Sequence, residues 1–277
     1  MASVMSPALS GAVFTISKRP AVWILAAVWA VQITCFAYLI PYLVSRSVGG
    51  EAADILPTLL PARSAEYIVG SLPIWGGPVL LLLGAVISGG EYRTGTLVTL
   101  LPRFPERSAF LLGRFAAISA VTAVYALMTL ALTAITSLIV ALVESTPALW
   151  PGPLEWLRGL AAIWLIMTAF ASLGFTLGVV TRSLPVAIGI GLLWTPGLEN
   201  LLAFLTGNLT VLRPLRAILL SPSAGSLAAA LAPTPVPDGT PGVAAISSPG
   251  TAITVLLVWV FVPLLVSLAF FRRRDVT

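Results

Sequence analysis

The sequence predicts an all-α integral membrane protein with six transmembrane helices, and three observations support this prediction. Hydrophobic residues make up 58% of the 277-residue chain and charged residues only 9%, whereas a soluble domain carries about 25% charged residues. Several uncharged runs reach about 20 residues, the length that crosses a hydrocarbon core of about 30 Å. Lipid offers no partner for a bare amide, so each run must form a helix. We therefore expect a single transmembrane domain, residues 1–277.

Five runs contain no charged residue and are predicted to cross the membrane completely. The first follows the basic pair Lys18 and Arg19, and it is too long for the core of a cleavable signal peptide. It is therefore expected to remain as an anchor. In chain order, the five predicted spans are Ala21–Val44, Ile68–Ser88, Phe115–Val143, Gly159–Thr181 and Thr251–Phe271.

A sixth span, between the fourth and the last, is less regular. It starts at Ser183 and meets Glu199, so a full crossing must carry that carboxyl group toward the far end of the helix. Prolines and glycines interrupt this run. In membranes such breaks are tolerated where neighbouring protein or a cavity satisfies the freed carbonyls.

The distribution of basic residues predicts that both termini are cytoplasmic. Arginine and lysine beside the ends of spans mark the cytoplasmic side. With the N-terminus inside, ten of the fifteen basic residues are cytoplasmic and seven of the ten acidic residues are external. The basic pI near 10.0 then reflects membrane orientation, and no nucleic-acid partner is needed to explain it.

Missing residue types exclude several chemistries. The chain has no histidine, which excludes His-based catalytic triads and imidazole proton relays. Its only lysine is Lys18, and it has no Gly-x-x-x-x-Gly-Lys-Ser/Thr loop to hold ATP phosphates. We predict no catalytic residue, metal site or cofactor in this chain. Any energy that it uses must therefore come from another protein.

The most informative segment is the polar stretch Gly89–Leu97, which lies between two apolar runs and precedes Pro102. On a helix of 3.6 residues per turn, Glu91, Gly95 and Thr99 form one row, opposite a row of leucine and valine. A glycine in the middle of that row lets another backbone approach closely. Residues 89–114 are therefore predicted to form a helical elbow at the cytoplasmic surface.

A second interpretation of the same residues is purely structural. Ser88-x-x-Glu91 fits a capping box, in which Ser88 and Glu91 satisfy the free amides at the start of a helix. Gly95 could then be a tolerated helix defect that costs about 1 kcal/mol. The residues alone leave partner docking and helix capping open.

The same segment resembles the signature that follows the second span in ABC transporter permeases of the type-2 exporter family. The resemblance rests on Glu91-Tyr92-Arg93-Thr94-Gly95-Thr96-Leu97, on Leu100-Leu101-Pro102 and on Arg107. The chain start is also similar to the amphipathic interfacial segment of that family: the resemblance rests on Ile16 to Trp23, with Lys18, Arg19 and Trp23, and the predicted cytoplasmic interfacial segment is residues 1–20. An acidic residue that many relatives carry before the basic cluster is missing. The six-span layout extends the resemblance over the whole chain.

The resemblance implies a fold, partners and site residues. It implies that residues 89–114 form the coupling helix that contacts a separate ATPase subunit, through Glu91, Tyr92, Arg93, Gly95, Thr96, Thr99 and Arg107. ATP and magnesium would be bound by two such ATPase chains, since no ATPase domain is fused to this one. A second copy or a paralogous permease would complete the translocation path.

Residues 199–250 are predicted to form an outer region. The resemblance implies short outer helices in residues 201–231 that dip back into the membrane, followed by a Pro/Gly-rich external loop. Glu199 is the candidate gate or outer-site residue. It could also be an interfacial carboxylate that pairs with Arg213 or Arg216 or contacts water.

The predicted function is that of a membrane subunit in a bacterial ABC exporter, resident in the inner membrane. Leucine, alanine, valine and aromatic residues dominate the spans, so the expected cargo is amphipathic or lipid-like: a drug, antibiotic, peptide or lipid. One alternative is a non-transport assembly or sensor subunit that binds a cytoplasmic partner through the same elbow. An intramembrane enzyme is disfavoured because the chain lacks histidine and pairs of buried acids.

Overall fold

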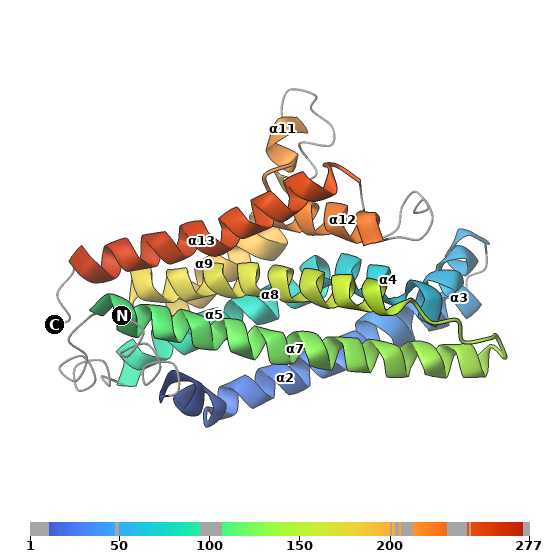
Figure 1. Ribbon diagram of the computed structural model, residues 1–277, viewed down its shortest axis with the longest axis horizontal. Coiled ribbons are helices and arrows are strands. Elements are labelled where there is room, and N and C mark those ends of the chain that lie inside the picture. The colour runs from blue at the N-terminus through green and yellow to red at the C-terminus, as the bar shows by residue number, and fades with distance from the viewer. Residues whose placement is uncertain are drawn as a thin grey trace.

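Long helices make up nearly all of the described chain (Figure 1). The computed structural model describes residues 11–47, 50–94, 107–199, 201–202, 205, 213–231, 243 and 245–273. Residues 11–17 are helical. Arg19 then precedes α2, which begins at Pro20, where the missing amide hydrogen of proline costs nothing.

The first two spans are continuous helices that contain π-helical segments. The first span, Pro20–Ser47, consists of α2 (Pro20–Gln32), η1 (Ile33–Leu39) and α3 (Ile40–Ser47). The 3-10 segment η2 (Gly50–Leu59) leads to the second span, Pro61–Gly90. That span consists of η3 (Pro61–Arg63), α4 (Ser64–Ser71), η4 (Leu72–Gly76) and most of α5 (Gly77–Thr94).

Three further spans are unbroken α-helices: α7 (Arg107–Val143), α8 (Pro153–Thr181) and α13 (Pro249–Arg273). All five predicted spans lie inside helices that are long and apolar enough to cross a membrane. The sixth prediction corresponds to α9 (Leu184–Leu192) and η6 (Leu193–Glu199), which form a shorter apolar helix. Its 16 residues extend about 24 Å at 1.5 Å per residue. A sixth crossing therefore stays a prediction.

The helices form a bundle with α5 and α8 at its centre. These two helices form the most extensive contact between any two elements. In Figure 1, α13 and α12 (Leu220–Leu231) lie on one side of this pair, and α7 and α2 lie on the other. Burial agrees, since 78% and 72% of the apolar windows in the spans that hold α5 and α8 are buried, against 28% to 33% in the other three.

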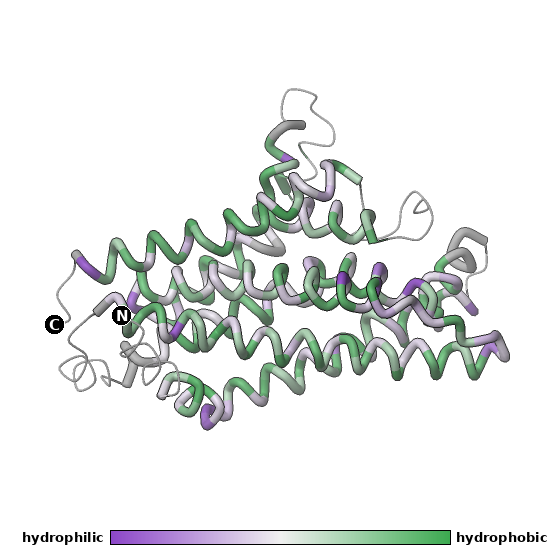
Figure 2. The backbone as a smooth tube through the Cα atoms, in the orientation of Figure 1, coloured by the Kyte–Doolittle hydropathy of each residue, from purple (hydrophilic) through white to green (hydrophobic). Residues whose placement is uncertain are grey.

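The outer surface of the bundle is apolar over the length of the long helices. Figure 2 shows hydrophobic residues along most of the length of α2, α7 and α13. Large side chains such as Trp23, Leu142, Phe261 and Leu265 are more than half exposed. A soluble protein rarely exposes apolar surface on this scale, but in lipid such a surface is the stable one. The protein is a multi-pass helical membrane protein.

The termini of the long helices lie at two opposite ends of the bundle. Residues 11–17, the end of α5, the start of α7 and the end of α13 all lie at the left end in Figure 1. The same-end placement agrees with the predicted arrangement of both termini and the elbow. Which compartment this end faces stays a prediction from the basic residues.

The outer region contains two short helices in its described part. These are α11 (Arg213–Arg216) and α12 (Leu220–Leu231), whose residues from Leu220 to Ala228 are mostly buried. The helix α12 packs on α13 and α4. Most of the Pro/Gly-rich loop lies outside the described residues, so the predicted loop is not tested.

Candidate functional site

The predicted coupling elbow begins as a continuation of α5. Glu91, Tyr92 and Arg93 lie in the last described turn of this helix, whose bounds are Gly77–Thr94. Gly95, Thr96 and Thr99 lie outside the described residues. Arg107 is the first described residue of α7. The two arms of the elbow are therefore the ends of two long helices.

Ser88 excludes the capping interpretation of this segment. It lies in the interior of α5, and its hydroxyl donates to the carbonyl oxygens of Gly84 and Ala85 at 3.1 and 3.4 Å. An N-cap residue lies at the start of a helix and bonds to amides that follow it. Ser88 bonds backward to carbonyls, so Ser88 and Glu91 do not form a capping box.

Arg19 fixes the N-terminal segment to α5 near the elbow. Its Nη1 atom donates to the carbonyl oxygens of Val86 and Ile87, at 3.0 and 3.3 Å. Both carbonyls lie in the interior of α5, seven and eight residues before Thr94. Gly90 leaves room for this approach, because a Cβ atom there would lie 3.1 Å from Nη1. Arg19 therefore links the predicted interfacial segment to the predicted coupling segment.

The other two residues of the interfacial prediction make local contacts. The Lys18 ammonium lies 5.7 Å from the centre of the Phe14 ring, a cation–π distance. The Trp23 indole donates to the carbonyl of Ser17 at 2.8 Å, while its ring is mostly exposed. An amphipathic ring of this kind suits a membrane boundary.

Glycines hold α5 against α8 at backbone contact. A Cβ atom at Gly84 would lie 2.0 Å from the Ala171 carbonyl oxygen, and one at Gly174 would lie 1.9 Å from that of Leu81. A Cβ atom at Gly178 would lie 2.0 Å from the hydroxyl of Ser88. Small residues at four-residue spacing allow such close packing in membranes. This contact between α5 and α8 was not predicted, although the four-residue spacing of Gly174 and Gly178 is a signal for it in the sequence.

Hydroxyl groups join α8 to α13. Ser172 donates to the carbonyl of Val260 at 2.8 Å, and Thr176 donates to that of Pro263 at 2.8 Å. Ser267 in turn donates to the Thr176 hydroxyl at 2.9 Å. All three side chains are buried, where hydrogen bonds between helices replace those that water would make. The helix that carries the elbow is thus packed on α8, and α8 is hydrogen-bonded to α13.

Glu199, the candidate outer-site residue, is buried at the start of α12. Its carboxylate accepts hydrogen bonds from the amide and the hydroxyl of Ser221, at 2.7 and 2.9 Å, and only 1% of the residue is exposed. A carboxylate is favourable at the positive N-terminal end of a helix. The Glu199 carboxylate is therefore not exposed to water, and within the described residues it forms no ion pair with Arg216. The side chain of Arg213 lies outside them.

At the opposite end from the elbow, an ion pair joins the first span to the third. Arg46 Nη2 lies 2.6 and 2.7 Å from the two carboxylate oxygens of Glu144, and the Tyr42 hydroxyl donates to the same carboxylate at 2.8 Å. This ion pair was not predicted from the sequence. About a hundred residues separate Glu144 from Arg46, so only the packing of the helices reveals the contact.

No metal-binding cluster of His, Cys, Asp and Glu occurs among the described residues. Comparison with known proteins also adds no assignment. No model of a known family matches the chain, and no curated protein matches it. The geometry at the end of α5 therefore carries the functional argument.

Proposed function

We propose that this protein is the membrane-spanning subunit of a bacterial ATP-driven ABC exporter. It would act in the plasma membrane as a dimer, with a second copy or a paralogue, and two separate ATPase subunits would dock on the elbow. Its cargo would be amphipathic or lipid-like. The observation that carries the proposal is that α5, which ends in the polar segment, is fixed at backbone contact to the helix at the centre of the bundle.

The contacts of α5 suit a lever that carries motion into the membrane. A force on the elbow would act on the end of a helix that extends from Gly77 to Thr94. That helix cannot slide freely past α8, because Gly84 and Gly174 place the two backbones in direct contact. The bonds of Ser172 and Thr176 would then pass the displacement on to α13. Packed helices of this kind move as units between discrete arrangements.

Arg19 would give the elbow its second support. Through the carbonyls of Val86 and Ile87, it holds α5 to the segment that is predicted to lie along the membrane surface. With this support, docking of an ATPase at Glu91 would displace the helix end together with the interfacial segment. Without it, the end of α5 could bend and absorb the motion.

The chemistry of ATP belongs to the partner in this proposal. ATP binding would draw the two ATPase chains together, and the permease dimer would switch between inward-facing and outward-facing states. The permease chain itself has no phosphate-binding loop. We therefore expect that it hydrolyses no ATP by itself, and that hydrolysis appears only with the partner.

The test is reconstitution with a candidate ATPase. The gene adjacent to this one, if it encodes an ATPase, would be co-expressed, and the complex would be purified and placed in lipid vesicles. The proposal expects a stable complex whose ATP hydrolysis rises when an amphipathic substrate is added. A stable complex whose ATP hydrolysis does not rise with added substrate would instead support a sensor or assembly subunit. ATP hydrolysis by the highly purified permease without an ATPase would overturn the proposal.

A further inference from the structure

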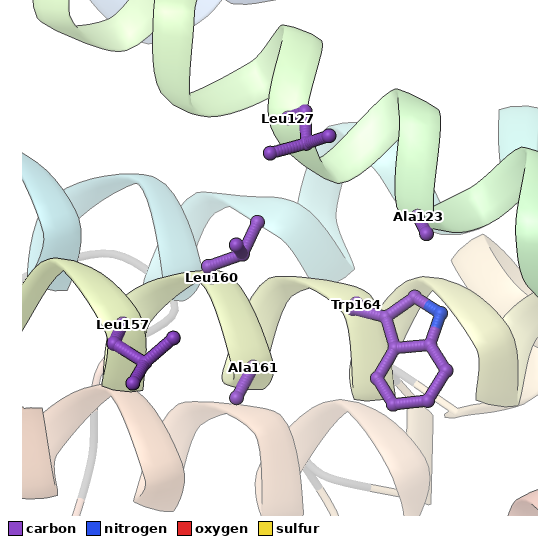
Figure 3. Close-up of a pocket in the computed structure, with 6 residues that line it drawn as sticks. All are labelled: Ala123, Leu127, Leu157, Leu160, Ala161 and Trp164. Atoms are coloured by element: carbon purple, nitrogen blue, oxygen red, sulfur yellow. The ribbon is translucent and has the colours of Figure 1, made fainter.

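An apolar hollow opens on the side of the bundle between α7 and α8. It has a volume of about 240 Å³ and is lined only by Ala123, Leu127, Leu157, Leu160, Ala161 and Trp164 (Figure 3). Pockets that enclose drug-sized ligands measure about 300 to 1,000 Å³. This hollow is therefore too small for a whole drug-sized ligand and suits part of a larger molecule, such as a segment of an acyl chain.

The hollow is built into the surface that faces lipid. Leu127 and Leu157 are more than half exposed, and Trp164 is 41% exposed. The Trp164 indole donates to the carbonyl of Ser119 at 3.0 Å, which fixes the ring and leaves only its apolar face for the hollow. Ala123 and Ala161 are small, so the surface recedes between the larger side chains. All of these residues lie in helices that can span a membrane.

A positive charge lies beside the hollow. Arg158 follows the lining residue Leu157 and precedes Ala161 by three positions, so it is a neighbour of Ala161 on the helix surface. The side chain is exposed, and it forms no ion pair within the described part of the chain. The nearby carboxylate of Glu155 is engaged by the amide of Gly152 at 2.8 Å.

Aromatic residues place this end of α8 at a membrane boundary. Trp156 lies two positions before Arg158, and its ring centre is 6.1 Å from that of Trp150. Tryptophans concentrate at the level of the lipid headgroups. An arginine at this depth can extend its guanidinium to the headgroups while its stem stays against apolar surface. The hollow extends from this level, at Leu157, along α8 to Trp164, toward the depth of the acyl chains.

We propose that the hollow and Arg158 form a binding site for one phospholipid. One acyl chain occupies the hollow between α7 and α8, and the phosphate of the same molecule binds Arg158. The entirely apolar lining suits an acyl chain, and a phosphate complements the charge of Arg158. A second copy of the chain is the competing occupant, and the test distinguishes the two. The proposal does not depend on ATPase docking or on transport.

Photolabelling tests the site in nanodiscs of phosphatidylcholine. The probe is a phosphatidylglycerol with a diazirine in one acyl chain, and the attached peptides are mapped by mass spectrometry. A diacylglycerol with the same chain is the matched probe that lacks the phosphate. We expect phosphatidylglycerol to label residues 123–127 and 157–164 more strongly than the lipid-facing side of α13. Inorganic phosphate should not compete.

Two variants separate the headgroup contact from the acyl contact. Arg158→Gln should lower phosphatidylglycerol labelling at the hollow about fivefold, the effect of losing one basic residue near a lipid surface, and should leave diacylglycerol labelling unchanged. Ala161→Phe should lower labelling by both probes, because the ring fills the hollow. The matched controls are Arg272→Gln and Val262→Phe, which change exposed residues of α13.

Three outcomes would overturn the proposal. Equal labelling of α8 and α13 would mean annular lipid only. Unchanged labelling in Arg158→Gln would remove the headgroup contact. A disulfide between copies that each carry Ala161→Cys, in a Cys35→Ala background, would assign the hollow to a second copy. Size-exclusion profiles establish that each variant is folded, and the exposed position of Ala161 makes that the expected result.

Discussion

Tyr67 donates its hydroxyl to the carbonyl oxygen of Ala37 at 2.5 Å, and so joins the second span to the first. The residue four positions later is Pro41, which has no amide hydrogen, so an α-helical bond to this carbonyl cannot form. A side chain also bonds to a backbone carbonyl just before α12, where the Trp259 indole donates to the carbonyl of Ile218 at 2.9 Å. In lipid a freed carbonyl must find a partner within the protein.

A double-mutant cycle tests this relationship. Tyr67→Phe should destabilise the protein by about 0.6 to 1.5 kcal/mol, because the hydroxyl is lost and the carbonyl is left without that donor. In a Pro41→Ala background the amide of residue 41 can serve the carbonyl, so the same change should cost less. Unfolding in SDS, followed by circular dichroism, measures the difference. Equal costs in both backgrounds would show that Pro41 does not create the need for Tyr67.

The backbone contact between α5 and α8 at Gly84 and Gly174 predicts that one added methyl group lowers the stability of the bundle strongly. Gly174→Ala should destabilise the bundle by about 1 to 3 kcal/mol, because the new Cβ atom meets the backbone of Leu81, which no rotamer change can move. Gly189→Ala is the matched control, since nothing lies within 4 Å of a Cβ atom there. The SDS unfolding midpoint should fall for the first variant alone. Similar midpoints would contradict the close approach of α5 and α8.

The lengths and polarity of the runs could be predicted from the sequence because they depend on local composition. The run Thr251–Phe271, for example, lies inside α13 almost residue for residue. The elbow was predicted less completely. A helical wheel cannot tell whether Glu91 starts a helix or ends one, and only the continuity of α5 through Ser88 answers this.

Contacts between distant residues could not be predicted from one sequence. Arg19 donates to carbonyls 67 and 68 positions away. Every residue carries a backbone carbonyl, so the residue types in the sequence do not identify these acceptors. The Ser221 partner of Glu199 was also missed, because a charge pattern draws attention to Arg213 and Arg216 instead. The basic residues predict an orientation, whereas hydroxyl and backbone groups make the contacts.

Arg19 should control the order of the end of α5. Arg19→Ala removes hydrogen bonds from a charged donor, which contribute about 1.5 to 3 kcal/mol, so amide exchange in residues 86–90 should accelerate about tenfold or more. Lys18→Ala is the matched control, because Lys18 contacts the Phe14 ring. Hydrogen-exchange mass spectrometry in nanodiscs measures both. Equal exchange in the two variants would remove the support assigned to Arg19.

The predicted orientation can be tested by cysteine labelling. In a Cys35→Ala background, cysteine at Asp54 or Asp238 should react with an impermeant maleimide in intact cells. Cysteine at Thr94 or Val276 should react only after permeabilisation, because ten of the fifteen basic residues lie on that side in the predicted topology. Labelling of Thr94→Cys from outside would reverse the topology and remove the docking proposal with it.

The docking proposal makes its sharpest prediction at Glu91 and Gly95. Glu91→Ala should uncouple ATP hydrolysis from transport or weaken assembly, since loss of a buried polar contact to a partner costs about 2 to 5 kcal/mol. Gly95→Leu should hold the two backbones apart and have the same result. Neither change should prevent membrane insertion.

The position of Glu91 makes the result interpretable. It lies in the last described turn of α5, where it does not cap the start of the helix, so Glu91→Ala should leave the stability of the permease nearly unchanged. A loss of coupling without a loss of stability therefore points to the partner. Glu91→Gln separates the contribution of the charge from that of hydrogen bonding, because the Gln amide oxygen still accepts a hydrogen bond but carries no charge. Thr94→Ala, in the same turn, is the matched control. Normal coupling in both Glu91→Ala and Gly95→Leu would refute the docking role of this surface.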